Sequence, residues 1–171
     1  MKDFFDVRAP TYEQHMKKSV EDLNAFYTSI SRAFPCTSKS PRILDLGVGT
    51  GLELGALFQR FPAARVTGID LSQEMLAELE KKEHAWMHQV QLVPGSFLEI
   101  DLGVSEYDGV ISAMALHHWI PEVKLDLYRR VRRALIPRGA FVNGDYVEVA
   151  DEAARRLADF RATAQNDRHH Y

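Results

Sequence analysis

The stretch "ILDLGVGTGLEL", residues 43–54, places three glycines at alternate positions shortly after an aspartate. Glycine adopts positive φ without strain and lets a ligand approach the backbone closely. A helix that follows such a turn also points unpaired N–H groups at the same place. One glycine would fit an ordinary tight turn. Three at this spacing favour a ligand-binding turn, so we expect Gly47, Gly49 and Gly51 to line a site.

Two carboxylates restrict the kind of ligand. The dinucleotide fingerprint G-x-G-x-x-G needs a glycine at position 52, where this chain has Leu52. Asp45, before the first glycine, would repel a pyrophosphate and suits a cation or an ammonium group. Asp70 closes a second apolar run, and a carboxylate there can accept hydrogen bonds from both hydroxyls of a ribose. The alternative role for Asp70 is that of an acidic residue at the start of a helix.

These residues need a scaffold, and the chain alternates between strand-like apolar runs and stretches of helical periodicity. Expected strands cover 42–46, 65–70, 90–95, 107–115 and 139–147, and expected helices cover 52–61, 72–88, 121–135 and 150–164. Ser72 is expected to cap the helix that it begins. The alternation predicts an α/β domain with a doubly wound, mostly parallel sheet of at least five strands. Ligands bind such sheets at the carboxyl ends of the strands, where the glycine turn lies.

The chain, residues 1–171, is expected to form one domain. The linker "PCTSKSP", residues 35–41, separates an N-terminal helical arm from the β/α core. The arm is assigned to residues 1–40, with its helix over 12–34, and the core to 41–171. No antiparallel strand pair is expected after the last helix. We therefore expect a shortened core whose fifth strand is an exposed edge, and such an edge invites formation of a homodimer.

Composition excludes several classes of protein. The net charge of −3 argues against a general nucleic-acid surface. The single cysteine, Cys36, excludes a disulfide framework and a cysteine-built zinc site. His84 and His88, one helical turn apart on the expected helix, have no evident third ligand, so we expect no metal site. With neither a signal peptide nor a membrane-spanning stretch in the sequence, the expected location is cytoplasmic.

Four segments resemble the motifs of class I S-adenosylmethionine-dependent methyltransferases. "ILDLGVGTGLEL" and "VTGIDLSQEML" look like the first two motifs, and "DGVISAMALHHW" and "LYRRVRRALIPRGAFVNGDYV" look like two later ones. "FFDVRAPTYEQHM" resembles the N-terminal cap of small-molecule members, including the ubiquinone/menaquinone type. Over residues 4–147, the resemblance implies a Rossmann-like methyltransferase fold, S-adenosyl-L-methionine as cofactor and a small-molecule acceptor.

The resemblance also implies contacts for the adenosine half of the cofactor. Asp70 would hold the ribose, and Leu71 and Met75 would pack on the adenine, where a methionine offers a polarizable apolar surface. The alternative for Met75 is an ordinary core position. Ser96 and Phe97 would meet the adenine edge. Many relatives carry an aspartate where this chain has Ser96, whose hydroxyl can still accept a hydrogen bond.

For the methionine half, the resemblance places Asp45 near the ammonium group, with the three glycines of the turn beside it. Ala113 and Met114 would flank the methionine chain and the methyl group. Arg8 and Tyr12, from the arm, would close the site over the carboxylate. The alternative for Arg8 and Tyr12 is a packed or solvated helix position.

The expected reaction is an in-line displacement, for which the protein must position the nucleophile and exclude water. A hydroxyl or carbon-acid acceptor would also need a general base. His117 and His118 follow the fourth expected strand and are the histidines at its carboxyl edge. A histidine with a pKa near ~6.5 suits that task, and the alternative for each is a capping or packing role.

Other functions stay open at this stage. A protein that binds the cofactor without turnover is the main alternative. A nucleic-acid methyltransferase fits less well, because the turn after the fourth strand reads "SAMALHHW" rather than an Asn/Asp-Pro-Pro-Tyr-like motif. An NAD-dependent dehydrogenase is weakened by Leu52 and Asp45.

Overall fold

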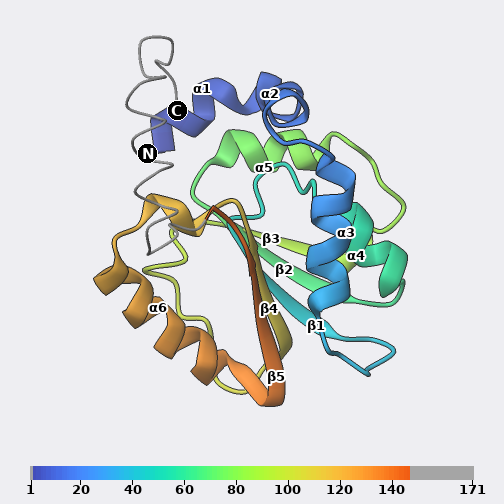
Figure 1. Cartoon of the computed structure of the whole chain (residues 1–171), viewed down its shortest axis with the longest axis vertical. Helices are drawn as coiled ribbons and strands as arrows, with labels where there is room; N and C mark the ends of the chain where they lie inside the picture. The colour runs from blue at the N-terminus through green and yellow to red at the C-terminus, as the bar shows by residue number, and fades with distance from the viewer. Residues whose placement is uncertain (1, 147–171) are drawn as a thin grey trace, which may run out of the picture.

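The computed structural model describes residues 2–146, which form a five-stranded sheet in the order β3-β2-β1-β4-β5 (Figure 1). All four strand pairings are parallel. The strands are β1 (Arg42–Leu46), β2 (Arg65–Asp70), β3 (Val90–Pro94), β4 (Tyr107–Ala113) and β5 (Leu135–Gly144). The strand order reverses between β1 and β4, which confirms the doubly wound parallel sheet expected from the sequence.

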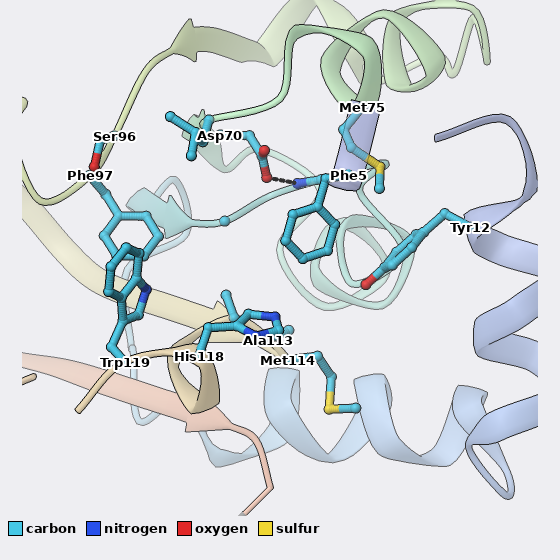
Figure 2. Close-up of a pocket in the computed structure, with 14 residues that line it drawn as sticks. Phe5, Tyr12, Asp70, Met75, Ser96, Phe97, Ala113, Met114, His118 and Trp119 are labelled. Atoms are coloured by element: carbon cyan, nitrogen blue, oxygen red, sulfur yellow. Dashed lines mark hydrogen bonds between the residues drawn. The ribbon is translucent and has the colours of Figure 1, made fainter. Parts of the chain in front are cut away.

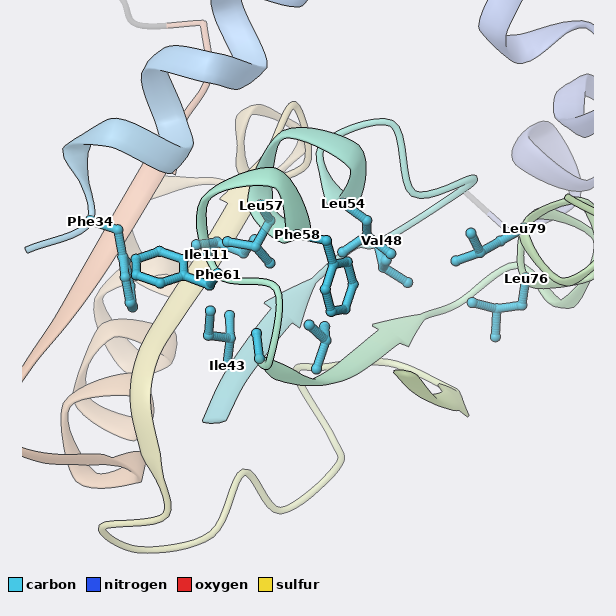
Figure 3. Packing of buried hydrophobic residues seen from close by; sticks show 12 residues of the cluster. Phe34, Ile43, Val48, Leu54, Leu57, Phe58, Phe61, Leu76, Leu79 and Ile111 are labelled. Carbon is cyan, nitrogen blue, oxygen red and sulfur yellow. The ribbon is translucent and has the colours of Figure 1, made fainter. Parts of the chain in front are cut away.

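Helices cover both faces of the sheet (Figure 1). Successive strand residues point to opposite faces, so Ile43 joins the core cluster that includes residues of α4 (Leu54–Arg60), while Leu44 joins the one beneath α6 (Pro121–Ala134). Figure 3 shows the first cluster, in which apolar side chains fill the space between α4 and the sheet. Both sides of the central strands are therefore packed, as parallel sheets require.

The N-terminal arm differs from the single expected helix over 12–34. It consists of α1 (Lys2–Arg8), η1 (Ala9–Thr11), α2 (Tyr12–Ser19) and α3 (Leu23–Ala33). The break before α3 lies at Asp22, whose φ of 48° leaves the helical region and whose side chain accepts a hydrogen bond of 3.1 Å from the Ala25 N–H. A side chain that caps a new helix here competes with continuation of the old one.

The helix expected over 72–88 is also shorter, because α5 (Gln73–Glu80) ends eight residues early. The chain turns at Glu83, whose φ is 48°. This turn lets Trp86 stack on Phe58 of α4, with ring centroids 4.8 Å apart and an interplanar angle of 12°. Burial of an aromatic surface against the core prevails over local helical periodicity.

This turn separates two histidines that the expected helix would have aligned. His84 stacks on Trp86, whereas Nδ1 of His88 lies 2.7 Å from the Ala85 carbonyl oxygen. The one-turn spacing expected for His84 and His88 is therefore wrong. Among residues 2–146, no three His, Cys, Asp or Glu side chains gather as a metal-binding group.

Strand β5 begins directly after α6, four residues before the expected start at 139. Its register shifts: Tyr107 pairs with Leu135, but Gly109 pairs with Ala140. Between these two pairs, four residues of β5 (136–139) face the single residue Asp108 of β4 and form a bulge, in which Arg138 has a φ of 68°. The helix expected over 150–164, and the expected lack of a following strand pair, lie outside the described residues. No helix within 2–146 is long and apolar enough to span a membrane.

Gly109 on β4 provides a test of the packing beneath α3. A Cβ at this position would lie 1.3 Å from Cζ of Phe34, a fully buried ring. We expect Gly109→Ala to lower the free energy of unfolding by about 1–3 kcal/mol or more, the range for overpacked cores. Exposed Gly55 of α4 has open space around its Cα. Gly55→Ala should therefore raise the free energy of unfolding by about 0.5–1 kcal/mol. Urea denaturation of both variants measures the difference, and equal effects would contradict this packing.

Candidate functional site

A cleft of about 610 Å³, including its open mouth, lies at the carboxyl ends of β1, β2 and β4 (Figure 2). This is where the strand order reverses, the usual ligand position in doubly wound sheets. Of the residues predicted from the sequence, the cleft is lined by Tyr12, Gly47, Gly49, Asp70, Leu71, Met75, Ser96, Phe97, Ala113, Met114 and His118. It is also lined by Phe5, Ala115 and Trp119, which sequence reasoning missed.

The three glycines of the turn have φ angles of 81°, 50° and 70°, all in the left-handed region. Gly47 lines the cleft, and a Cβ there would lie 2.6 Å from the Cβ of Ala115. Gly49 also lines the cleft, where a Cβ would lie 3.9 Å from Oδ2 of Asp70 and 4.0 Å from the Gly47 carbonyl oxygen. Gly51 does not, because its Cα faces Leu79 of α5, which a Cβ would approach to 2.7 Å. The first two glycines therefore shape the cleft, and the third brings α5 close to the turn.

Asp70, at the end of β2, is held by two main-chain donors. Its Oδ2 accepts from the Gly49 N–H at 2.8 Å (Figure 2). Its Oδ1 accepts from the Ser72 N–H, also at 2.8 Å. Burial raises the pKa of Asp70 and these donors oppose the rise. A carboxylate has about four lone-pair sites, so each oxygen keeps capacity for a further donor. The side chain lines the cleft and presents two fixed acceptors there.

Ser72 links the arm to this site. Its Oγ accepts a hydrogen bond of 3.1 Å from the Met75 N–H, which confirms the expected N-cap of α5. The same hydroxyl donates to Oδ1 of Asp6 at 2.7 Å. Asp6 belongs to α1, and the contact holds this helix over the start of α5. The ring of Phe5 thereby reaches the cleft.

Below the glycine turn lies a buried pair of acids. Asp45 is fully buried and Glu53, which precedes α4, is only 5% exposed. Both oxygens of Asp45 and Oε1 of Glu53 lack a donor among the described residues. The two carboxyl groups interact with each other; burial raises the pKa of Asp45 well above its usual range and that of Glu53 to about 7. Sequence reasoning missed Glu53, since an acid at a helix start is usually exposed.

Lys82 ties the turn to the arm. Its Nζ donates to the Thr50 carbonyl oxygen and forms an ion pair with Glu13 of α2. The neighbouring Tyr12 lines the cleft, where burial and then the charge of Glu53 hold the pKa of its hydroxyl far above the usual value. Tyr12 therefore presents a protonated phenol at neutral pH.

Two histidines follow β4 on the 3-10 turn η3 (Leu116–His118). His118 lies at the cleft, with its ring 3.9 Å from that of His117 and 5.5 Å from that of Phe5. His117 is not part of the lining. Its Nδ1 lies 2.6 Å from Oδ1 of Asp145, and its main-chain N–H donates to Oδ2 at 2.8 Å. Sequence reasoning missed Asp145, because the strand expected over 139–147 included it, whereas β5 ends at Gly144.

Charge is distributed unequally between these groups. Burial lowers the pKa of His118, and the neighbouring His117 lowers it further. Burial would raise the pKa of Asp145, but the bonds and charge of His117 bring it below the usual range. At neutral pH the site thus holds a neutral imidazole at the cleft and an ionised carboxylate behind it.

Arg8 lies outside the lining of the cleft. Its guanidinium sits 4.0 Å from the centre of the Phe4 ring on the same helix. A cation over an aromatic face is a stable arrangement for an arginine. The role expected for Arg8 over a ligand carboxylate stays a prediction.

Comparison with known proteins shows a family relationship. A family model described as "Methyltransferase domain" matches residues 43–139, more than half of the chain. The chain is 26% identical, over 91% of its length, to a malonyl-[acyl-carrier protein] O-methyltransferase of Halorhodospira halophila. It is 37% identical, over 48% of its length, to a demethylmenaquinone methyltransferase of Chlorobaculum parvum.

A solved structure also resembles this fold. The crystal structure of an S-adenosylmethionine dependent methyltransferase from Mesorhizobium loti superposes with a TM-score of 0.57 and 29% identity, over 67% of this chain and 51% of that one. The matches cover 55% of the Halorhodospira protein and 35% of the Chlorobaculum protein. The chain thus spans about half the length or less of the curated relatives it matches.

The Ser72 contacts can be tested by Ser72→Ala. This change removes the cap of α5 and the bond to Asp6, and we expect it to lower the free energy of unfolding by about 0.5–2 kcal/mol. Amide hydrogen exchange should also accelerate in α1, which loses its attachment. Ser29→Ala is the control, because that exposed hydroxyl bonds only to the Ala25 carbonyl within its own helix. Unchanged exchange in α1 would show that Ser72 does not hold the arm.

Proposed function

The chain belongs to the methyltransferase domain family, and from this premise we propose that it binds S-adenosylmethionine in the cleft and transfers the methyl group to a small molecule. The observation that carries the proposal is Asp70, whose two oxygens are fixed by main-chain donors beside a glycine turn that lines the cleft. The residues present therefore fit this cofactor.

For the adenosine half, we propose that Asp70 binds both ribose hydroxyls through its remaining lone pairs. Leu71 and Met75 would pack on the adenine. Met75 is 2% exposed, so it serves the core and the cleft together. Ser96 and Phe97 would contact the adenine edge. The Ser96 hydroxyl already accepts from the Leu98 N–H at 3.3 Å and keeps acceptor capacity for an amine.

For the methionine half, Ala113 and Met114 lie at the end of β4. Met114 has a φ of 56°, uncommon for a residue with a side chain. Its N–H bonds to the Gly144 carbonyl oxygen at 2.8 Å, and this bond between β4 and β5 fixes the turn. The turn brings Ala115 against Gly47. Met114 thus forms part of the wall of the cleft that we assign to the methyl group.

When bound, S-adenosylmethionine supplies an electrophilic sulfonium methyl group. The chain's part is to orient the acceptor, to exclude water and, for a hydroxyl or acidic carbon, to remove a proton. We assign the base to His118, which lies at the cleft and is neutral at pH 7. His117, held by Asp145, is assigned as the residue that positions it. Both assignments are proposals.

The acceptor is proposed only by class. The two relatives named above act on a malonyl-[acyl-carrier protein] and a demethylmenaquinone, as their names state. In this chain Phe5, Phe97 and Trp119 give the cleft an aromatic wall, which favours an acceptor with an apolar part. The homodimer and the cytoplasmic location expected from the sequence stay predictions, and binding without turnover is the alternative if no acceptor is methylated.

The cofactor assignment is tested by Asp70→Ala. We expect binding of S-adenosylmethionine to weaken by roughly 1.5–3 kcal/mol, the size of lost charge-assisted hydrogen bonds. Isothermal calorimetry measures this change, with circular dichroism to check folding. Asp126→Ala removes an exposed acid on α6 and should leave the affinity unchanged. An equal affinity in both folded variants would exclude the ribose contact.

The histidine assignment predicts a shift that NMR can follow. Because His117 lowers the pKa of His118, His117→Gln should move the His118 titration upward, toward its usual value near 6.5. Side-chain ¹⁵N titration of the ligand-free chain measures this shift. His88→Gln, on a distant exposed segment, should leave it in place. A downward or absent shift would show that the two rings are not coupled.

A further inference from the structure

Asp45 and Glu53, the acid pair below the glycine turn, are buried, and most of their carboxyl oxygens lack hydrogen-bond donors from the described residues. Packing of the fold alone does not account for two such acids. Asp45 belongs to β1 and Glu53 precedes α4. In the described residues, three carboxyl oxygens of this pair have no donor, and the hydroxyl of Thr50 in the turn also lacks a partner. Buried polar groups are nearly always hydrogen-bonded. None of these three residues lines the cleft itself, but they adjoin the turn whose Gly47 and Gly49 do. A cluster of unpartnered groups in this position therefore indicates a missing donor.

The surroundings of the pair are acidic. The charged or titratable groups whose electrostatic influence reaches it are Asp70, Lys82, Tyr12 and Tyr27, besides the two acids themselves. Lys82 is the one cation among these described residues, and it is already paired with Glu13. Two ionised carboxylates in one buried site repel each other strongly. The pair therefore holds a proton between its two carboxyl groups when no cation is bound.

Resting on the proposed function, we propose that Asp45 and Glu53 together bind the primary ammonium group of S-adenosylmethionine, and that their shared proton leaves to solvent as the ammonium enters. The ammonium keeps its three protons. The pair gives up the proton that it holds when empty, and two carboxylates then face one positive charge. Glu53 is thereby assigned as a binding residue, and binding is coupled to pH.

The chemistry of the site selects an ammonium group over other cations. An ammonium offers three N–H donors and no acceptor, and three carboxyl oxygens of the pair lack a donor. Tyr12 lines the cleft and also interacts with Glu53, so the pair lies next to the wall formed by the arm. Lys82 cannot supply the missing charge, because its Nζ is engaged by Glu13 and by the Thr50 carbonyl oxygen.

The sign of the pH dependence follows from the proton. Burial raises the pKa of Glu53 to about 7, so the pair is protonated at pH 6 and must lose its proton before it binds a cation there. The affinity for S-adenosylmethionine should therefore rise with pH between 5.5 and 7, at most tenfold per pH unit for one proton. If binding displaced no proton, the affinity for S-adenosylmethionine would not change between pH 5.5 and 7.

The decisive experiment is calorimetry at pH 6 in two buffers of different ionisation enthalpy. The difference in heat counts the protons released on binding. S-adenosylmethionine should release at least about one proton. 5′-Methylthioadenosine, which has the adenosine and the thioether but neither the ammonium nor the carboxylate, should bind without release. Release with both ligands, or with neither while both bind, would overturn the proposal.

Glu53→Gln is the matched variant, since it keeps the shape of the side chain and removes its titration. It should abolish proton release and flatten the pH dependence, while 5′-methylthioadenosine binds as before. Glu122→Gln, at an exposed position of α6, should behave as the parent chain. If the parent chain binds neither ligand, the proposed function fails. If it binds both and Glu53→Gln still releases a proton, only this inference fails.

A second measurement needs no ligand. Because the pair binds its proton more tightly when folded, stability should decrease as pH rises from 5 to 8 through the pKa of Glu53. Glu53→Gln should remove part of this decrease in the thermal unfolding midpoint, and Glu122→Gln should not. An identical pH dependence in the parent chain and Glu53→Gln would show that the pair does not share a proton.

Discussion

The carboxylate of Asp70 is the interaction on which the rest of the site depends. It accepts from Gly49 in the turn after β1 and from Ser72 at the start of α5, so one side chain joins three segments. Ser72 in turn caps α5 and holds Asp6 of the arm. The glycine turn, the start of α5 and helix α1 of the arm are therefore positioned by one connected set of hydrogen bonds. The end of β2 lies at the centre of this set.

Around this centre the protein concentrates acidic groups that no basic side chain among residues 2–146 is seen to pair with. Asp45, Glu53 and Asp70 are largely buried, and Lys82 is engaged elsewhere. Such burial is unfavourable in an empty site, because a buried carboxylate loses its hydration. A ligand with positive charge relieves this cost by its charge and its donors. The arrangement thus suits a cofactor that carries both a sulfonium and an ammonium group, which is the one we propose.

The opposite wall follows a different principle. There Asp145 is paired with His117, and the pKa of the cleft-lining His118 is lowered by burial and by its neighbour. The carboxylate of Asp145 at this wall has hydrogen-bond partners on His117, whereas three carboxyl oxygens of Asp45 and Glu53 have none among the described residues. In the proposed function, one side of the cleft therefore attracts a cation while the other offers a neutral base.

The sequence by itself determined the parallel sheet, the glycine turn, Asp70 at the strand end and the Ser72 cap, because periodicity and turn chemistry are local properties. It could not determine where α5 ends, since the stacking of Trp86 on Phe58 decides this. Nor could it show that Glu53 is buried against Asp45 or that Asp145 meets His117, 28 positions away. Those contacts join side chains from different elements. Their pairing, and with it their protonation, exists only once the sheet and its helices have packed.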